Sequence, residues 1–263
     1  MRRIGAALID SGAYLMGEKD DSIPPTRLHF VGHGSFTAIG YEFLRYFTEF
    51  AGLKPNEDVL DVGCGIGRMA IPLANFLRQG QYRGIDIVPA GIEWCQQNIT
   101  PKHPNFRFEL SDIKNTAYNP DGRYKASEYR FPFDDQSFDF VFLTSVFTHL
   151  VPEDAENYLS EISRVLRPGG RLLGTWFLLN SESRQLVAAG RGSRPIVYEF
   201  KGKEVMVENP AVPEAAIAFD EELIRGIHAK YQLRLQDDIR FGKWCGREDF
   251  VSYQDIIVAH KAP

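Results

Sequence analysis

The chain has 263 residues, of which 44% are hydrophobic, a composition typical of a globular protein with a large core. Its formal net charge is −5, so no overall positive field draws it to nucleic acid or to an anionic membrane, and neither is an expected partner. Three scattered cysteines are too few for a disulfide framework, so we expect free thiols in a cytoplasmic protein. The protein is expected to be a monomer or a homodimer.

The first 52 residues are expected to form an N-terminal cap region. The apolar run from Ile4 to Ile9 is too short for a signal peptide, and no stretch reaches the ~20 apolar residues that cross a bilayer. Residues 35–50 carry apolar side chains at helical spacing, and Ser35 is a typical N-cap residue. An amphipathic helix is therefore predicted over residues 35–50.

A short apolar strand followed by three alternating glycines is the main motif of the chain. Asp61 lies inside that strand, two positions before the first glycine, and Gly63, Gly65 and Gly67 follow it. Glycines let the backbone turn sharply and approach a ligand, and the start of the next helix offers unpaired N–H groups. The G-x-G-x-G spacing differs from dinucleotide and phosphate-binding loops, and the Asp61 carboxylate suits a ligand that carries an ammonium group.

Strand and helix patterns alternate after this motif, which predicts a parallel sheet with helices on both faces. Predicted strands cover residues 58–62, 82–87, 106–109, 138–144 and 171–179, with β-like stretches at 233–241 and 253–260; predicted helices cover 67–77 and 89–99, one that starts at Pro152, and one from Asp220 to about 231. Pro72 removes a backbone hydrogen bond inside the first of these helices, so a bend or a 3₁₀ turn is expected there. Pro168, Gly169 and Gly170 are expected to stop the helix that starts at Pro152.

Residues 59–68, in which Arg68 follows the last glycine, resemble the first motif of the class I S-adenosylmethionine-dependent methyltransferases. The likeness covers roughly residues 53–178, and residues 131–170 resemble bacterial small-molecule methyltransferases. The resemblance implies S-adenosylmethionine as cofactor and an α/β, Rossmann-like three-layer sandwich. Its sheet would be mostly parallel and seven-stranded, with an antiparallel last strand. Residues 53–179 would form the cofactor-binding core, and residues 180–218 a substrate lid inserted between strand five and the last helix. Residues 219–263 would hold the last helix and strands six and seven.

The cofactor site is expected at the carboxyl ends of the strands. Asp86 ends the second predicted strand, where a carboxylate can accept hydrogen bonds from ribose hydroxyls; a solvated loop acid is the alternative. In the resembling family an acid at the place of Asp112 takes the adenine amino group, although Asp112 also suits a turn. Arg68 either reaches the cofactor carboxylate or covers its helix. The predicted cofactor-binding residues are Asp61, Gly63, Cys64, Gly65, Gly67, Arg68, Asp86, Ile87, Asp112, Ile113, Thr144 and Ser145.

His149 is the histidine that the pattern places beside this edge of the sheet, and a pKa near ~6.5 would suit it to act as general base. A packing histidine is the alternative. The predicted substrate contacts are Phe36, Tyr41, Tyr118, His149 and Trp176. The expected reaction is O- or N-methylation of a small polar acceptor, such as a sugar or a natural-product intermediate.

Other motifs are weaker. His29 and His33 stand four residues apart, but glycines interrupt any helix between them, so no metal site is expected. Residues 244–247 are expected to form a turn between the last two strands. An NAD-dependent oxidoreductase remains an alternative function, because that class also places a glycine turn before an acid. A non-catalytic S-adenosylmethionine-binding protein is the other.

Overall fold

The computed structural model describes residues 23–29, 34–116, 118–202, 204–236 and 238–262, so His33 and the first 22 residues of the expected cap region lie outside it. Two compact units make up the chain: residues 1–57 with 64–111, and residues 58–63 with 112–263. Within the described ranges, no helix combines the length and the apolar character that crossing a bilayer requires.

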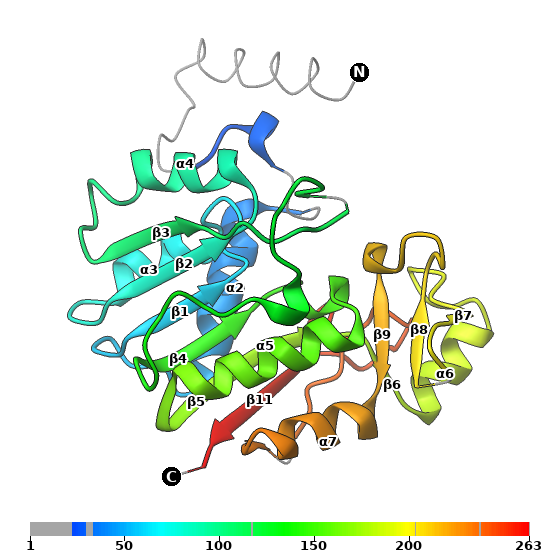
Figure 1. Cartoon of the computed structure of the whole chain (residues 1–263). Helices are drawn as coiled ribbons and strands as arrows, with labels where there is room; N and C mark the ends of the chain where they lie inside the picture. Colours follow the sequence, from blue (N-terminus) through cyan, green and yellow to red (C-terminus); the bar gives the residue numbers. More distant parts are fainter. Residues whose placement is uncertain (1–22, 30–33, 117, 203, 237, 263) are drawn as a thin grey trace. The chain divides into compact units, whose positions relative to one another are not determined.

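The main sheet has seven strands in the order β10-β11-β5-β4-β1-β2-β3 (Figure 1). The pairs β1–β4, β4–β5 and β2–β3 are parallel, whereas β11 runs antiparallel to both of its neighbours, β5 and β10. This confirms the predicted mostly parallel sheet with an antiparallel last strand.

The first unit contains η1 (Thr26–Leu28), α2 (Phe36–Glu49), α3 (Ala70–Phe76), β2 (Tyr82–Asp86), α4 (Pro89–Asn98) and β3 (Phe106–Leu110). Ser35 caps α2 as predicted, since its side chain accepts a hydrogen bond from Ala38 N. The bend expected at Pro72 is absent from this described helix, because α3 begins at Ala70 rather than near Gly67. Pro72 therefore lies in the first turn, where a missing N–H costs no helical hydrogen bond.

The second unit begins with β1 (Val59–Val62), η2 (Ala126–Glu128), β4 (Phe138–Leu143), η3 (Phe147–His149), α5 (Pro152–Val165) and β5 (Leu166–Trp176). The apolar β4 is buried along nearly its whole length, as a central parallel strand should be. Pro168, Gly169 and Gly170 do not end α5, because the helix stops at Val165 and these residues already belong to β5. The strand predicted over residues 171–179 divides into β5 and the short β6 (Leu178–Leu179).

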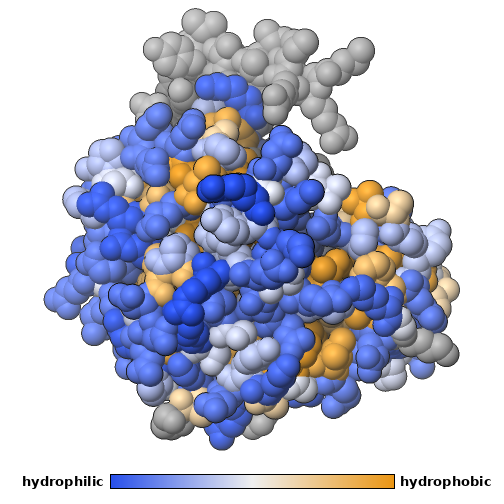
Figure 2. All heavy atoms as spheres, viewed as in Figure 1, coloured by the Kyte–Doolittle hydropathy of each residue, from blue (hydrophilic) through white to orange (hydrophobic). Residues whose placement is uncertain are grey.

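The insertion of residues 180–218 contributes strands to a second sheet with the order β6-β9-β8-β7. It contains α6 (Ser181–Ala188), β7 (Tyr198–Glu199), β8 (Val205–Val207), η4 (Pro213–Ala215) and the start of β9 (Ile217–Asp220). Its core is apolar: Phe177, Leu179, Val187, Ile196, Ala216, Ala218, Trp244 and Cys245. On the face drawn in Figure 2, apolar side chains reach the surface around β9, whereas the surface over α5 is mostly hydrophilic.

The chain ends with α7 (Glu221–Lys230), β10 (Leu233–Leu235) and β11 (Asp255–Lys261). Asp220 caps α7 as predicted, by accepting a hydrogen bond from Glu222 N. Helices α5 and α7 lie side by side (Figure 1), and Ser163 Oγ donates to Tyr231 O at 2.8 Å. The stretch predicted over residues 233–241 keeps only three residues as a strand, followed by a bridge between Arg240 and Ile256.

Candidate functional site

The glycine turn takes backbone conformations that favour glycine. Gly65 and Gly67 have φ of +57° and +79°, in the left-handed region. A Cβ at Gly67 would also lie 2.7 Å from Ile99 Cδ1, so a side chain there would collide with the end of α4. The second and third glycines are thus needed for the turn itself.

Asp86 places its carboxylate against this turn. Oδ2 accepts a hydrogen bond from Gly65 N at 2.7 Å, and Oδ1 accepts one from Val88 N at 2.9 Å. Burial raises the pKa of Asp86, while these backbone amides lower it. A carboxylate has four lone pairs in all, so Asp86 can accept a further hydrogen bond from a ligand hydroxyl beside its backbone partners Gly65, Ile87 and Val88.

Other predicted residues of the first unit include Cys64, Arg68, Phe36 and Tyr41. Cys64 is buried, and its N–H donates to Ile85 O at 3.0 Å. The Arg68 guanidinium lies over the Phe36 ring, 5.3 Å from its centre, and burial lowers the pKa of Arg68. Phe36 is therefore a buried partner of Arg68, whereas Tyr41 on the same helix is half exposed.

Asp61 is fully buried in the middle of β1. Burying a carboxylate costs free energy unless a structural partner or a ligand compensates for the lost water. Gly63, which follows the strand, has φ of +85°, and a Cβ there would lie 2.3 Å from Val146 Cγ2. The first glycine thus packs directly against the turn that follows β4.

Asp112 forms an ion pair with Arg123. Its Oδ2 accepts from Arg123 Nε at 2.6 Å, and its Oδ1 accepts from Arg123 N at 3.2 Å. These hydrogen bonds lower the pKa of Asp112. Ile113 beside it is buried, and Ile87 in the first unit is half-buried. The turn-forming and the ligand-binding interpretations of Asp112 are compatible, because a carboxylate can accept further hydrogen bonds.

Ser145 has a backbone conformation that is unusual for a residue with a side chain. It follows β4 after Thr144, it is exposed, and its φ is +59°. Its N–H donates to Thr175 Oγ1 at 2.7 Å, and its hydroxyl donates to Gln254 Oε1 at 3.1 Å. Side chains from β5 and from the residue before β11 therefore hold this turn.

His149 ends the 3₁₀ helix that follows this turn, and its Nδ1 lies 2.8 Å from Glu214 O in the insertion. A carbonyl oxygen only accepts hydrogen bonds, so Nδ1 carries the proton and the neutral ring keeps a lone pair on Nε2. Burial lowers the pKa of His149, which favours the neutral ring near pH 7. The Tyr118 ring, whose residue is 43% exposed, meets the imidazole edge to face with 6.4 Å between centres.

Trp176 is fully buried in the second unit. Its ring stacks on Phe147 with 3.8 Å between centres, and it meets Phe219 and His228 edge to face. Through Phe147, Trp176 packs against the 3₁₀ helix that ends at His149. Its predicted contact with a substrate stays a prediction.

The weaker motifs have structural roles. His29 stacks on Phe36 with 5.1 Å between centres. Trp244 is fully buried and donates to Asp255, which places it in the core of the insertion. These contacts favour the structural interpretation of each residue.

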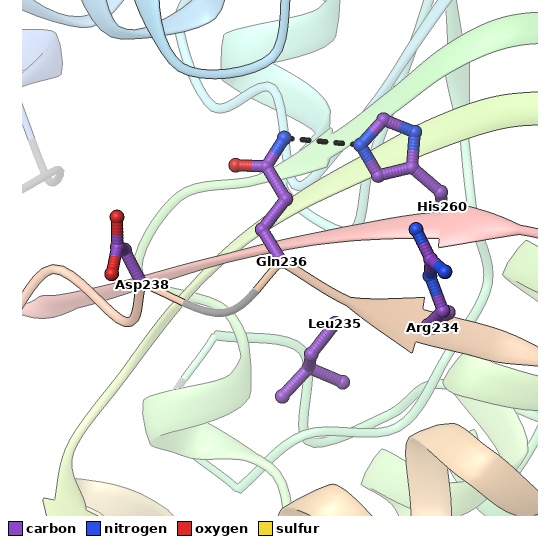
Figure 3. Close-up of a pocket in the computed structure, with 5 residues that line it drawn as sticks. All are labelled: Arg234, Leu235, Gln236, Asp238 and His260. Carbon is purple, nitrogen blue, oxygen red and sulfur yellow. Dashed lines mark hydrogen bonds between the residues drawn. The ribbon is translucent and has the colours of Figure 1, made fainter.

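An open pocket lies beside β10 and the end of β11 (Figure 3). It is lined by Arg234, Leu235, Gln236, Asp238 and His260. Gln236 Nε2 lies 3.0 Å from His260 Nε2, and burial lowers the pKa of His260. None of the predicted cofactor or substrate residues is among its lining residues.

Sequence reasoning missed three residues that contact predicted site residues: Thr175, Glu214 and Gln254. Gln254 and Ser145 are separated by 109 positions, and His149 and Glu214 by 65. No local pattern marks pairs so distant. Arg123 differs, because it follows a turn signal at Pro120 and Gly122 that folds the chain back towards Asp112.

Part of the chain matches a known protein family. Residues 60–174 match the model of a family described as a methyltransferase domain. The phthiotriol/phenolphthiotriol dimycocerosates methyltransferase of Mycobacterium leprae is 35% identical over 114 residues, 43% of this chain and 35% of that protein. The fatty-acid O-methyltransferase of Mycolicibacterium smegmatis is 35% identical over 119 residues, 44% of this chain and 36% of that protein. The chain thus spans about a third of the length of these curated relatives.

A solved structure shows the same fold. The magnesium protoporphyrin IX methyltransferase of Synechocystis PCC 6803, with bound SAH, superimposes with a TM-score of 0.55 at 16% identity, over 100% of both chains. At that identity the likeness concerns the fold alone. It agrees with the order of strands in the seven-stranded sheet.

Proposed function

Because this chain carries a class I S-adenosylmethionine-dependent methyltransferase domain, we propose that it transfers the methyl group of S-adenosylmethionine to a hydroxyl group of a small organic acceptor. The observation that carries the proposal is the Asp86 carboxylate, which accepts a hydrogen bond from Gly65 N inside the glycine turn. This arrangement supports a ribose-binding role for Asp86, because the backbone beside it takes conformations that favour glycine.

The residues fit the cofactor. In this proposal Asp86 accepts hydrogen bonds from the ribose hydroxyls, and Asp112 accepts one from the adenine amino group. Thr144 and Ser145 bind the methionine moiety through their backbone groups. Asp61 offers a negative charge to its ammonium group, and Arg68 a positive charge to its carboxylate. Both carboxylates that would bind hydroxyl or amino groups keep unused lone pairs.

When bound, S-adenosylmethionine supplies a methyl group that is already activated by its sulfonium sulfur. The chain must orient the acceptor and take up its proton. His149 suits the second task, because the hydrogen bond to Glu214 O leaves the lone pair on Nε2. Orientation can supply ~7–11 kcal/mol, whereas a general base contributes ~10²–10⁴-fold in rate, so orientation is expected to dominate.

The acceptor is proposed to combine a hydroxyl group with an apolar skeleton, rather than to be a sugar. The Tyr118 ring beside His149 offers apolar surface next to the base. Two relatives are named for dimycocerosates and for fatty acids, and these names support an acceptor with an apolar skeleton.

Calorimetric titration with S-adenosylhomocysteine tests the proposal. The unmodified chain is expected to bind it and to ignore NADH. Asp86→Asn removes the charge while keeping the size, and should raise the Kd about tenfold or more, since hydrogen bonds to charged groups contribute ~1.5–3 kcal/mol. Asp249→Asn changes an exposed carboxylate elsewhere and should leave the Kd unchanged. Binding of NADH alone, or equal affinity of the Asp86 variant, would show the proposal to be wrong.

A further inference from the structure

Ser145, in the turn after β4, has a left-handed backbone conformation at a place where such a conformation is unusual. Four described residues other than glycine have φ in the left-handed region: Gln136, Ser145, Lys201 and Gln232. Gln136 and Gln232 lie in tight turns between elements, and Lys201 lies in the bend between β7 and β8. Ser145 instead leaves a buried central strand. A left-handed residue of this kind costs roughly 1–2 kcal/mol, so surrounding contacts must hold it.

Side chains from two other strands supply those contacts. Thr175 Oγ1 accepts from Ser145 N, and Thr175 is fully buried in β5. Gln254 Oε1 accepts from Ser145 Oγ at 3.1 Å, and Gln254 Nε2 reaches Thr148 Oγ1 at a long 3.5 Å. One buried amide therefore contacts the turn at Ser145 and the 3₁₀ helix at Thr148.

The residue after Gln254 fixes its position. Asp255 is fully buried, and its carboxylate accepts hydrogen bonds from Leu178 N, Gly242 N and Trp244 Nε1, each at 2.7 Å. These donors come from β6 and from the segment before β11. With its neighbour held by three short hydrogen bonds, the Gln254 backbone has little freedom to move.

The turn in its present position also contacts the glycine motif. Val146 Cγ2 would lie 2.3 Å from a Cβ built at Gly63, so the Val146 side chain packs on the Gly63 backbone in space that a Cβ would otherwise fill. A displacement of the Ser145–Val146 turn would therefore disturb the first glycine of the motif or leave a gap against it.

We infer that Gln254 is a positioning residue for the cofactor site: it holds Ser145 in the left-handed conformation through the Ser145 hydroxyl, and thereby fixes the turn that packs on Gly63. The inference rests on the proposed function. Gln254 acts through Ser145 and has no direct contact with the cofactor in this scheme. A segment that precedes the last strand of the sheet thus takes part in binding a ligand whose motif lies near residue 63.

A double-mutant cycle on S-adenosylhomocysteine binding tests this inference by calorimetry. Gln254→Met keeps the length of the side chain and removes the hydrogen bond, and Ser145→Ala removes the partner hydroxyl. Each variant is expected to raise the Kd about fivefold to tenfold, the equivalent of one hydrogen bond. The double variant should bind no more weakly than either single variant, because both changes remove the same contact. Gln185→Met, at an exposed position of α6, is the matched control and should bind normally.

Gln254→Glu supplies a rescue, since a carboxylate oxygen can still accept from the Ser145 hydroxyl; it is expected to bind better than Gln254→Met. Ser145 is exposed, so Ser145→Ala provides a test even if Gln254→Met does not fold. Normal affinity of either single variant, or additive effects in the double variant, would overturn the inference. If the unmodified chain does not bind S-adenosylhomocysteine at all, the proposed function fails, and the inference fails with it. If the unmodified chain binds and the variants bind equally well, only the inference fails.

Discussion

At the level of a single residue, the two ring nitrogens of His149 can be tested separately: Nδ1 donates to Glu214 O in the insertion, and Nε2 is the atom proposed to take a proton. Asn at this position can imitate the Nδ1 donor, whereas Gln can imitate Nε2. If His149 is the general base, His149→Asn should keep the melting temperature and lower kcat about 100-fold or more. Release of S-adenosylhomocysteine in the presence of a panel of long-chain hydroxylated acceptors measures this effect.

The pH dependence gives an independent check on the same residue. Burial lowers the pKa of His149 below its ordinary 6.5, so the base should be in its neutral, active form at pH 7 and above. The kcat of the unmodified chain is expected to be flat above pH 7 and to fall on acidification. His149→Asn should remove that fall. A variant that turns over like the unmodified chain would assign His149 to packing.

At the scale of elements, the close approach of Gly63 to the turn after β4 predicts a graded cost for added methyl groups. Gly63 and Gly169 both have positive φ, but a Cβ at Gly169 meets nothing within 4 Å. Gly169→Ala should therefore lower the free energy of unfolding by only about 1–2 kcal/mol, the cost of the backbone conformation. Gly63→Ala adds a collision with Val146 and should cost more.

Urea denaturation of the two variants measures this difference, and Val146→Ala provides the decisive background. Removing Cγ2 takes away the atom that the new Cβ would meet, so Gly63→Ala should cost less in that background than in the unmodified chain. Equal costs at Gly63 and Gly169 would mean that the turn moves freely away from the glycine motif.

Elements with a local signature were predictable from the sequence. The glycine turn, the acid at the end of β2, the Ser35 and Asp220 caps and the buried β4 depend on residues that are close in the chain. Two helix ends were wrong for a local reason. Pro72 fits the first turn of a helix as well as it disrupts an interior, and Gly169 and Gly170 fit near the start of β5, where its register against β4 shifts.

The second sheet and the contacts of the candidate site were not predictable. Strands β7, β8 and β9 are two to four residues long, and their pairing depends on partners that no short window contains. The same holds for Gln254 with Ser145 and for Glu214 with His149, because long-range packing alone brings them together.

At the scale of the whole molecule, His228 predicts a loss of stability in acid. It is fully buried in α7, and burial lowers its pKa from 6.5 to about 4. Between those values the unfolded chain binds a proton that the folded chain does not. The free energy of unfolding therefore keeps its full value with respect to His228 above pH 6.5, and it decreases as the pH falls below 6.5. Between pH 7 and pH 5 the contribution of this residue should fall by about 2 kcal/mol.

Urea denaturation at pH 7 and pH 5 checks this prediction, with His228→Leu as the reference. Asp255 has the opposite effect in this range, because burial raises its pKa to about 6 and the folded chain takes up that proton first. Only the difference between the unmodified chain and His228→Leu is therefore informative. Stability that changes equally with pH in both proteins would contradict the assignment to His228.

The insertion leaves the core and returns to it at neighbouring strands. Leu178 in β6 pairs with Phe219 in β9, so the two ends of the intervening segment are about 5 Å apart, the spacing of adjacent strands. The Asp255 carboxylate holds Leu178 N at the same place. A segment joined at two adjacent points can be lengthened, shortened or replaced while the seven-stranded sheet keeps its connections. Evolution can thus exchange the insertion, the predicted substrate lid, without rebuilding the glycine turn, and chimaeras that carry another protein's insertion between Leu179 and Ile217 would test whether this segment selects the acceptor.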